Sequence, residues 1–243
     1  MSSELFSEIS GPKGKKPVLR PFRHSYLVIL LIIIMILLVV GLELRFFLKE
    51  FVVHEAERDA IRISSAIRDQ EIGRLVKRKE NDQYYLALSQ EDLSNLDQEI
   101  RVFLASFDIV KIKIFNTEMQ IIYSTDSKII GKLDTGNAKL TMALSGETTS
   151  KYESKDSIWD LASEERINLE LVETYVPILS SNGKIIGSFE IYKDITRDLM
   201  IVNKILIRAV GILLIITMSI FGGFVFVMYR ASNTRQATQP SQD

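Results

Sequence analysis

The segment IVKIKIFNTEMQIIYSTDSKIIGK, residues 109–132, has the pattern of two strands joined by a tight polar turn. Apolar residues at positions 110, 112 and 114 alternate with residues 111, 113 and 115, two of which are lysines. This period of two is typical of a strand with one buried face. The polar sequence NTEM then reverses the chain, and QIIYSTD returns it. The segment therefore predicts an antiparallel hairpin.

The chain after the hairpin predicts three more strands. A short helix is expected at 137–144, followed by Gly146 as its C-cap and by TTSKYE as a strand. Residues 153–165 are charged, contain the only tryptophan, Trp159, and are expected to form a covering loop. The last two strands are INLELVETYVPIL and KIIGSFEIYKDI, joined through SSNGK, in which the pair Asn-Gly is the strongest short-range hairpin signal.

Two helices are expected before the hairpin. In the first, small or apolar residues recur at every third or fourth position, namely Val52, Ala56, Ala60, Ile63 and Ile67. No glycine or proline lies between Leu42 and Ile72, so this helix is expected to be unbroken. Its stripe is equally compatible with packing on the chain's own sheet and with dimerisation. A second helix is expected at 90–106, and the order of elements predicts an α+β sheet with helices packed on one face.

Two apolar runs without charges flank this domain. Residues 26–42 form a run of 17 and residues 209–229 a run of 21. The second run is about 31 Å long as a helix and the first is at the short end of the spanning range, since a hydrocarbon core is about 30 Å thick. The sequence GLELRFFLKE after the first run lacks the small residues of a signal-peptide cleavage site, so an uncleaved membrane anchor is expected.

Basic residues predict the orientation of both anchors. The segment before the first run carries Lys13, Lys15, Lys16, Arg20 and Arg23 against only two glutamates, and Arg230 and Arg235 follow the second run. By the positive-inside rule, both ends are expected in the cytoplasm. The predicted organisation is a cytoplasmic tail (1–24), a transmembrane helix (25–43), an extracytoplasmic domain (44–208), a transmembrane helix (209–229) and a short cytoplasmic tail (230–243). The expected location is the inner (plasma) membrane, with the central domain periplasmic or extracellular.

Composition argues against several other functions. Residues 43–208 carry 23 lysines and arginines against 28 aspartates and glutamates, a net charge of −5, so no nucleic-acid surface is expected. The chain has no cysteine, and its two histidines, His24 and His54, are predicted on opposite sides of the membrane, where they cannot share a metal. No glycine-rich phosphate loop occurs, and the acidic pairs 164/165 and 170/173 are interpreted as solvated charges. Neither an enzyme nor a metal or other cofactor is expected.

Three spaced blocks resemble the extracytoplasmic Cache domain, a PAS-like sensor of bacterial membrane histidine kinases, diguanylate cyclases and chemoreceptors. The blocks are IVKIKIFNTEMQIIYSTDSKIIGK, ALSGETTSKYE, and LVETYVPIL followed by NGKIIGSFEIYKDIT. The resemblance covers residues 43–208 and implies a PAS-like antiparallel five-stranded sheet with a long N-terminal helix, flanked by two transmembrane helices. Met119 departs from the resemblance, because the first hairpin turn of such domains commonly contains glycine.

The resemblance implies a small-molecule pocket formed by the sheet and the loops over it. The candidate ligand-binding residues combine aromatic walls with a few polar groups, as ligand pockets do: they are Tyr123, Ser124, Asp126, Trp159, Tyr175, Glu190 and Tyr192. Lys111 and Lys113 point the same way from one strand and either meet a ligand carboxylate or form the wet face of the sheet.

The segment after the second apolar run, RASNTRQATQPSQD, is too short for a kinase or a cyclase. The expected role is therefore a sensor, of the two-component type, that passes a signal to a separate cytoplasmic partner. Two alternatives stay open: a receptor shortened by loss of its output domain, and a membrane scaffold that docks another extracytoplasmic protein. A homodimer is expected, and Ser219 with Gly223 forms a small-xxx-small pair that allows two membrane helices to approach closely.

Overall fold

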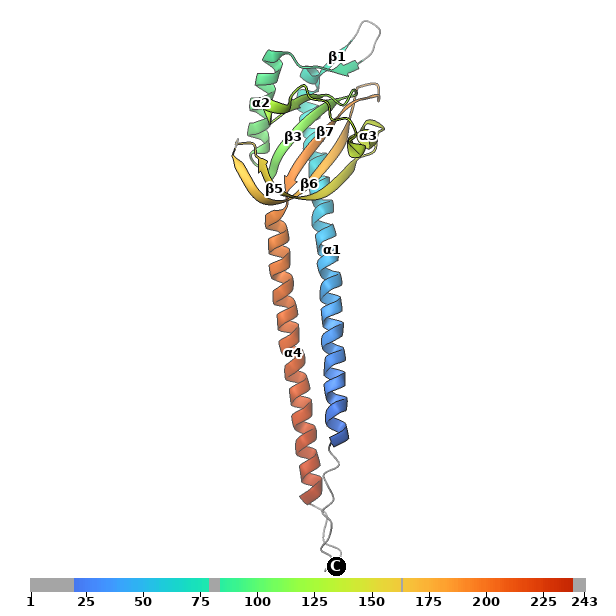
Figure 1. Cartoon of the computed structure of the whole chain (residues 1–243), viewed down its shortest axis with the longest axis vertical. Helices are drawn as coiled ribbons and strands as arrows, with labels where there is room; N and C mark the ends of the chain where they lie inside the picture. Colours follow the sequence, from blue (N-terminus) through green and yellow to red (C-terminus); the bar gives the residue numbers. More distant parts are fainter. Residues whose placement is uncertain (1–19, 79–83, 163, 238–243) are drawn as a thin grey trace, which may run out of the picture. The chain divides into compact units, whose positions relative to one another are not determined.

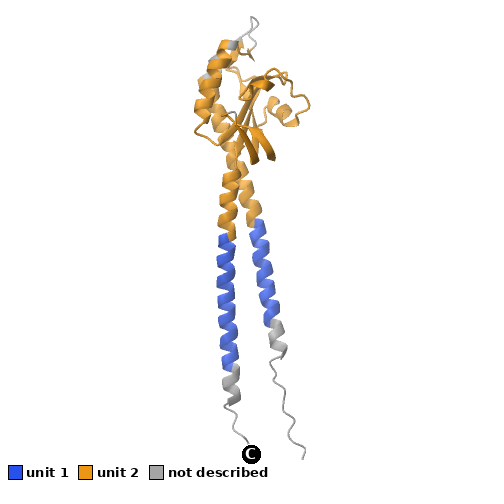
Figure 2. Ribbon diagram, turned by 60° about the vertical axis from the view of Figure 1, so that its left-hand side comes forward, with its two compact units in different colours: residues 1–43, 208–243 blue, residues 44–207 orange. Residues whose placement is uncertain are grey.

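The computed structural model describes residues 20–78, 84–162 and 164–237. Residues 1–19 of the predicted first tail and residues 238–243 of the predicted second tail lie outside the described residues. The chain forms two compact units, residues 44–207 and residues 1–43 with 208–243, which are described in turn (Figure 2). The helices are α1 (Arg20–Leu75), α2 (Gln90–Leu104), α3 (Ala138–Leu144), α4 (Thr196–Ala237) and the short 3₁₀ helix η1 (Ser127–Ile129). The strands are β1 (Val76–Arg78), β2 (Tyr84–Leu86), β3 (Ile109–Asn116), β4 (Ile121–Ser124), β5 (Thr149–Trp159), β6 (Glu165–Leu179) and β7 (Ile185–Asp194).

The centre of the unit formed by residues 44–207 is a five-stranded antiparallel sheet with the order β4-β3-β7-β6-β5 (Figure 1). The predicted fold class is confirmed: the fold is α+β, with a five-stranded antiparallel sheet and a long N-terminal helix. Of the five strands of this sheet, β3 comes first along the chain and β7 comes last, and these two strands pair directly. Residues about 80 positions apart in the sequence therefore become neighbours. β1 and β2 form a separate two-stranded ladder that the sequence analysis did not predict.

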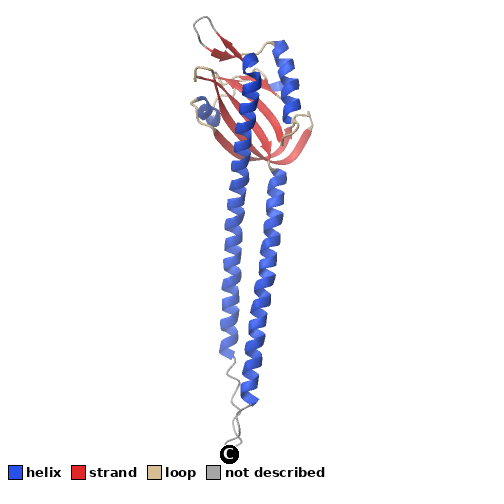
Figure 3. Cartoon of the chain, turned by 180° about the vertical axis from the view of Figure 1, so that it is seen from behind, coloured by secondary structure: helices blue, strands red, loops and turns tan. Residues whose placement is uncertain are grey.

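α1 and α2 cover one face of the sheet (Figure 3). The predicted stripe of α1 is buried on the chain's own sheet, and Ala60 is fully inaccessible to solvent. Of the two alternatives for this stripe, packing on the sheet is therefore correct. The ion pair of Lys193 on β7 with Asp59, and the hydrogen bond from Ser150 on β5 to Glu57, fasten α1 to the strands. α2 begins at a capping box formed by Ser89 and Asp92 and contributes its apolar stripe to the same core.

α3 covers the opposite face, which contradicts the expectation that the helices pack on one face only. Its residues Leu140 and Ala143 are buried against Phe115 of β3 and Tyr175 of β6. The apolar face of α3 is short, so the sequence does not show which face of the sheet this helix covers. The direction of the Phe115 side chain decides it, because this residue alternates with Ile114, which belongs to the core under α1.

The predicted loop at 153–165 is wrong over most of its length. β5 extends to Trp159 and pairs with β6 as far as Glu165, so only a short turn separates the two strands. β5 is an edge strand of the sheet, and charged side chains are common on edge strands because they discourage pairing with another chain. The charged residues of 153–165 are therefore explained by the position of β5 at the edge of the sheet and do not indicate a loop.

The remaining unit contains the two apolar segments of α1 and α4. Both helices are long and apolar enough to cross a membrane, and their large apolar side chains are exposed. Within this unit the two helices contact each other: a Cβ at Gly41 would lie 3.4 Å from Val210, and the rings of Tyr26 and Phe224 meet edge to face with centroids 6.0 Å apart. α1 is a single helix from Arg20 to Leu75, as its sequence without glycine or proline between 42 and 72 predicted.

Candidate functional site

The sheet face under α3 carries two rows of polar and aromatic side chains across neighbouring strands. In one row Lys113 lies opposite Glu190, which lies opposite Tyr175. In the next row Lys111 lies opposite Tyr192, which lies opposite Glu173. Directly paired residues of antiparallel strands share a face, so the six side chains form one surface. We call these six residues, Lys111, Lys113, Glu173, Tyr175, Glu190 and Tyr192, the polar face.

Glu190 is the centre of the polar face and is only 1% exposed. Its Oε1 accepts hydrogen bonds from the hydroxyls of Tyr175, at 2.7 Å, and Tyr192, at 2.6 Å. The ammonium of Lys113 lies 2.8 Å from Oε2 of Glu190 and donates a hydrogen bond to the Tyr192 hydroxyl, also at 2.8 Å. A buried carboxylate needs such partners, because an uncompensated charge in the interior is costly.

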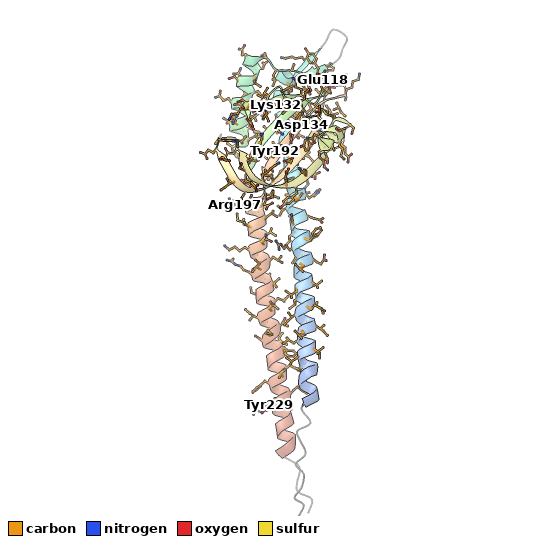
Figure 4. All side chains as sticks on the ribbon, viewed as in Figure 1. Glu118, Lys132, Asp134, Tyr192, Arg197 and Tyr229 are labelled. Atoms are coloured by element: carbon orange, nitrogen blue, oxygen red, sulfur yellow. The ribbon has the colours of Figure 1, made fainter. Side chains whose placement is uncertain are left out.

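The loops over the sheet reach this network through Asn137. Its side-chain oxygen accepts a hydrogen bond from the backbone of Leu140 and so caps α3. Its side-chain nitrogen donates to the Tyr175 hydroxyl at 3.1 Å and to Asp134 at 3.0 Å. Asn137 thus ties the start of α3 to the polar face (Tyr192 and Asp134 are labelled in Figure 4).

A second carboxylate, Glu173, is 4% exposed and lies beside the first. Burial raises its pKa to about 7, and the negative charge of Glu190 adds to this effect. Lys155 on β5 lies 3.5 Å from Oε1 of Glu173 and also pairs with Glu153 at 2.9 Å. Glu173 therefore keeps its proton to a higher pH than an exposed glutamate, whereas a hydrogen bond from Lys151 lowers the pKa of Glu153.

Two carboxylate oxygens of the polar face have no hydrogen bond from the described residues. They are Oε1 of Glu173 and Oε2 of Glu190, each buried and each within ion-pair distance of a lysine. A buried acceptor without a donor costs roughly 1–3 kcal/mol, more for a charged group. The ammonium of Lys113 at 2.8 Å already serves Oε2 of Glu190, so Oε1 of Glu173, whose lysine lies at 3.5 Å, is the position where a further donor would gain most.

The polar face is suited to recognition. Burial, followed by the charge of Glu190, raises the pKa of Tyr175 and of Tyr192, so both phenols keep their protons. They remain hydrogen-bond donors at any physiological pH. The six residues contain no histidine, serine or cysteine, and the groups that they present are hydrogen-bond donors, hydrogen-bond acceptors and charges. Among the described residues, no group of three histidine, aspartate or glutamate side chains is arranged to hold a metal ion.

Comparison with known proteins gives structural neighbours only. No protein-family model matches the chain, and no curated protein matches it. The chain is similar to the sensor domain of DcuS from E. coli, with 16% identity, coverage of 47% of this chain and 71% of that chain, and a TM-score of 0.30. It is also similar to the sensor domain of the histidine kinase DctB from V. cholerae, with 11% identity, 60% and 57% coverage and a TM-score of 0.35.

A third neighbour is the periplasmic sensory domain of the chemoreceptor Tlp1 from Campylobacter jejuni. The identity is 11%, the match covers 64% of this chain and 58% of that chain, and the TM-score is 0.34. The matches span less than two thirds of the DctB and Tlp1 chains. All three neighbours are described as sensor domains, the class of domain that the sequence resembles.

The structure brings together four of the nine predicted ligand residues in one network: Lys113, Tyr175, Glu190 and Tyr192. Three more adjoin it. Lys111 pairs with Asp126 at 3.2 Å, and the Ser124 hydroxyl accepts a hydrogen bond from the backbone of Asp126. The two lysines do not form a wet face, because each is largely buried beside a carboxylate of its own chain.

Two predicted ligand residues lie elsewhere. Tyr123 belongs to the core under α1 and α2, where its hydroxyl donates to Asp97 of α2 at 3.1 Å. Trp159 is at the end of β5 rather than in a covering loop, is 53% exposed, and has the ammonium of Lys128 5.5 Å from its ring. Tyr123 and Ser124 are adjacent on one strand, so their side chains point to opposite sides of the sheet, and only Ser124 lies on the side of the polar face.

Glu173 and Asn137 were missed by the sequence analysis. The interpretation of Glu173 as a solvated charge is wrong, because the side chain is buried. A signal was present: Glu173 precedes Tyr175 by two positions, which puts both on one face of the strand. Asn137 lies in a loop, and no periodicity of the sequence connects it with the sheet.

Proposed function

We propose that the chain is a membrane-anchored sensor whose extracytoplasmic domain binds a small ligand on the polar face and passes the signal across the membrane to a cytoplasmic partner. In this proposal residues 25–43 and 209–229 span the inner membrane, both termini are cytoplasmic and the receptor is a homodimer. We call the unit formed by residues 44–207 the outer unit. α1 and α4 each contain residues of the outer unit and of an apolar segment, and this supports a role for both helices in transmission.

The observation that carries the proposal is the pair of buried carboxylates, Glu173 and Glu190, that lie side by side on one sheet face among lysines and phenol hydroxyls. A sheet face that only needed stability would be expected to bury apolar residues, because replacing a buried ion pair by apolar residues is often neutral or stabilising. The polar face instead combines two carboxylates, two phenols and two lysines beneath α3 and its loop. Strongly shifted pKa values with specific charged partners are typical of functional sites.

The test is a ligand screen on the full-length protein in detergent, read out by thermal unfolding. The library contains small carboxylates, amino acids, polyamines and divalent metal ions. A ligand that binds only the folded state at 100 times its Kd stabilises that state by about 2.7 kcal/mol. We expect one chemical class to raise the melting temperature in a concentration-dependent way, and the Tyr175→Phe variant to lose most of this response.

The matched control is Glu118→Gln, which changes an exposed residue in the turn between β3 and β4 (labelled in Figure 4). It should respond to the ligand as the natural protein does. A flat response across the whole library, together with one constant extracytoplasmic protein recovered by cross-linking in cells, would contradict the proposal. That result would favour the scaffold alternative.

A further inference from the structure

A cavity of about 260 Å³ lies within the outer unit, away from the polar face, where α1, α4 and the edge of the sheet meet. The lining comes from the outer part of α1, from β5 and β6, and from the first turns of α4; it comprises Arg45, Lys49, Tyr152, Asn168, Glu170, Thr196, Leu199, Met200, Val202 and Asn203. We call it the junction cavity. Neighbouring apolar residues pack together beside these elements, namely Ala56 of α1, Val172 of β6, Ile195 immediately before α4 and Leu199 of α4.

The charges in the junction cavity favour an anion. Arg45 and Lys49 contribute two positive charges, and Glu170 contributes one negative charge that already accepts a hydrogen bond from the Tyr152 hydroxyl. The Lys49 ammonium lies 3.7 Å from the centre of the Tyr152 ring. Within the described part of the chain, neither Arg45 nor Lys49 has a carboxylate within ion-pair distance. One added negative charge would therefore balance the lining.

The position of the lining along the chain indicates where that anion comes from. Arg45 and Lys49 follow the predicted end of the first span, residue 43, by two and six residues, or about 3 and 9 Å of helix. Asn203 precedes the predicted start of the second span, residue 209, by six residues. The headgroup layer of a bilayer is about 5–8 Å thick on each side, so Arg45 falls within this layer and Lys49 and Asn203 fall at its outer edge.

Exposed apolar side chains on the same helix segments support this depth. Phe46, Phe47 and Phe51 of α1, and Met200 and Ile205 of α4, are all more than half exposed. Large apolar side chains at this density on two neighbouring helix segments are typical of contact with lipid. Arg45 and Lys49 have long side chains that can keep their charges at the level of the phosphates.

We propose that the junction cavity binds the phosphate group of an anionic phospholipid of the outer leaflet. Arg45 and Lys49 hold the phosphate oxygens by charge-assisted hydrogen bonds, and the side-chain nitrogens of Asn168 and Asn203 provide further donors. The lipid chains lie against the exposed phenylalanines of α1. The site fixes a lipid at the point where α1 and α4 leave the sheet, and it is independent of any ligand on the polar face.

The test uses the full-length protein in detergent, with short-chain phosphatidylglycerol, short-chain phosphatidylcholine and inorganic phosphate as separate probes. Native mass spectrometry measures bound lipid, and thermal unfolding measures stabilisation. We expect phosphatidylglycerol to bind in preference to phosphatidylcholine. The double variant Arg45→Gln/Lys49→Gln should bind it about tenfold or more weakly, because both charge-assisted hydrogen bonds to the phosphate are lost.

Lys204→Gln is the matched control, because Lys204 is basic, exposed and adjacent to Asn203 but does not line the cavity. It should bind phosphatidylglycerol within about twofold of the natural protein. Asn203→Leu, which fills the cavity without changing a charge, should weaken binding as the double variant does. Equal binding of the two lipids, an unaffected double variant, or displacement of phosphatidylglycerol by inorganic phosphate would each overturn the proposal.

Discussion

Tyr175 and Glu190 lie directly opposite each other on β6 and β7, and the Tyr175 hydroxyl donates a 2.7 Å hydrogen bond to Oε1 of Glu190. On the same row Lys113 approaches the other oxygen of this carboxylate from β3. Residues of three strands therefore contact or carry one buried carboxylate, that of Glu190, and the same residues belong to the candidate ligand site. A substitution in this row should therefore change both the stability of the fold and the proposed ligand binding.

Replacement of Glu190 by alanine should strongly destabilise the unit formed by residues 44–207. The change leaves the Lys113 charge and the hydroxyls of Tyr175 and Tyr192 without their acceptor, and removal of one partner of a buried pair costs about 3–5 kcal/mol. Denaturant unfolding of the full-length protein in detergent measures the loss. Glu118→Ala, at an exposed turn, should stay within about 0.5 kcal/mol of the natural protein, and an equal loss in both variants would contradict this account.

The free energy of unfolding should depend on the protonation of Glu173. Its pKa is raised to about 7 in the folded state from an ordinary value near 4.5, so the folded state holds the proton more tightly. This contribution is fully present below pH 4.5 and is lost as the pH rises to about 7. The lost stability reflects the burial of Glu173 beside Glu190, opposed by the positive charge of Lys155.

Glu173→Gln is the variant that isolates this effect. The neutral amide cannot ionise, so the fall in stability between pH 4.5 and 7 should be smaller than in the natural protein. Unfolding curves at several pH values in the same detergent provide the comparison. An identical pH profile in the two proteins would show that another group is responsible.

Replacement of Gly187 by alanine should disturb the contact between β3 and β7. A Cβ at this position would lie 2.1 Å from the backbone oxygen of Phe115 and 2.3 Å from the side chain of Leu86. Backbone cannot move aside cheaply, so we expect a loss in the upper part of the range of about 1–3 kcal/mol that overpacking costs. Gly211→Ala is the control, since a Cβ there meets no described atom within 4 Å. A melting temperature lowered equally in both variants would count against the steric reason.

Ala60→Leu should weaken the packing of α1 on the sheet. Ala60 is fully buried, and its small side chain permits the close approach of the helix. We expect a loss of about 1–3 kcal/mol, measured by denaturant unfolding. Arg62→Leu, two positions along the same helix, changes a side chain that is 67% exposed and should have little effect. If Ala60→Leu were also neutral, the stripe would not be held against the sheet as described.

The candidate site was partly predictable because strand periodicity assigns side chains to faces. Lys111 with Lys113, Tyr175 with Glu173, and Glu190 with Tyr192 are each separated by two residues. Periodicity also explains the error at Tyr123, which cannot share a face with its neighbour Ser124. The register between strands was not predictable, because the pairing of Lys113 with Glu190 joins positions 77 residues apart.

Local features of this protein were predictable from its amino-acid sequence alone. Uncharged runs predicted two helices that are apolar enough to cross a membrane, unbroken helix-forming sequence predicted the long α1, and alternation predicted the strands, since each depends on residues within a few positions of one another. Only the tertiary structure decided that β3 lies beside β7, that α3 covers the face opposite α1, and that Glu173 and Glu190 are buried together. These features arise from packing between distant segments, where the burial of apolar surface fixes the strand order and forces the polar residues into contact.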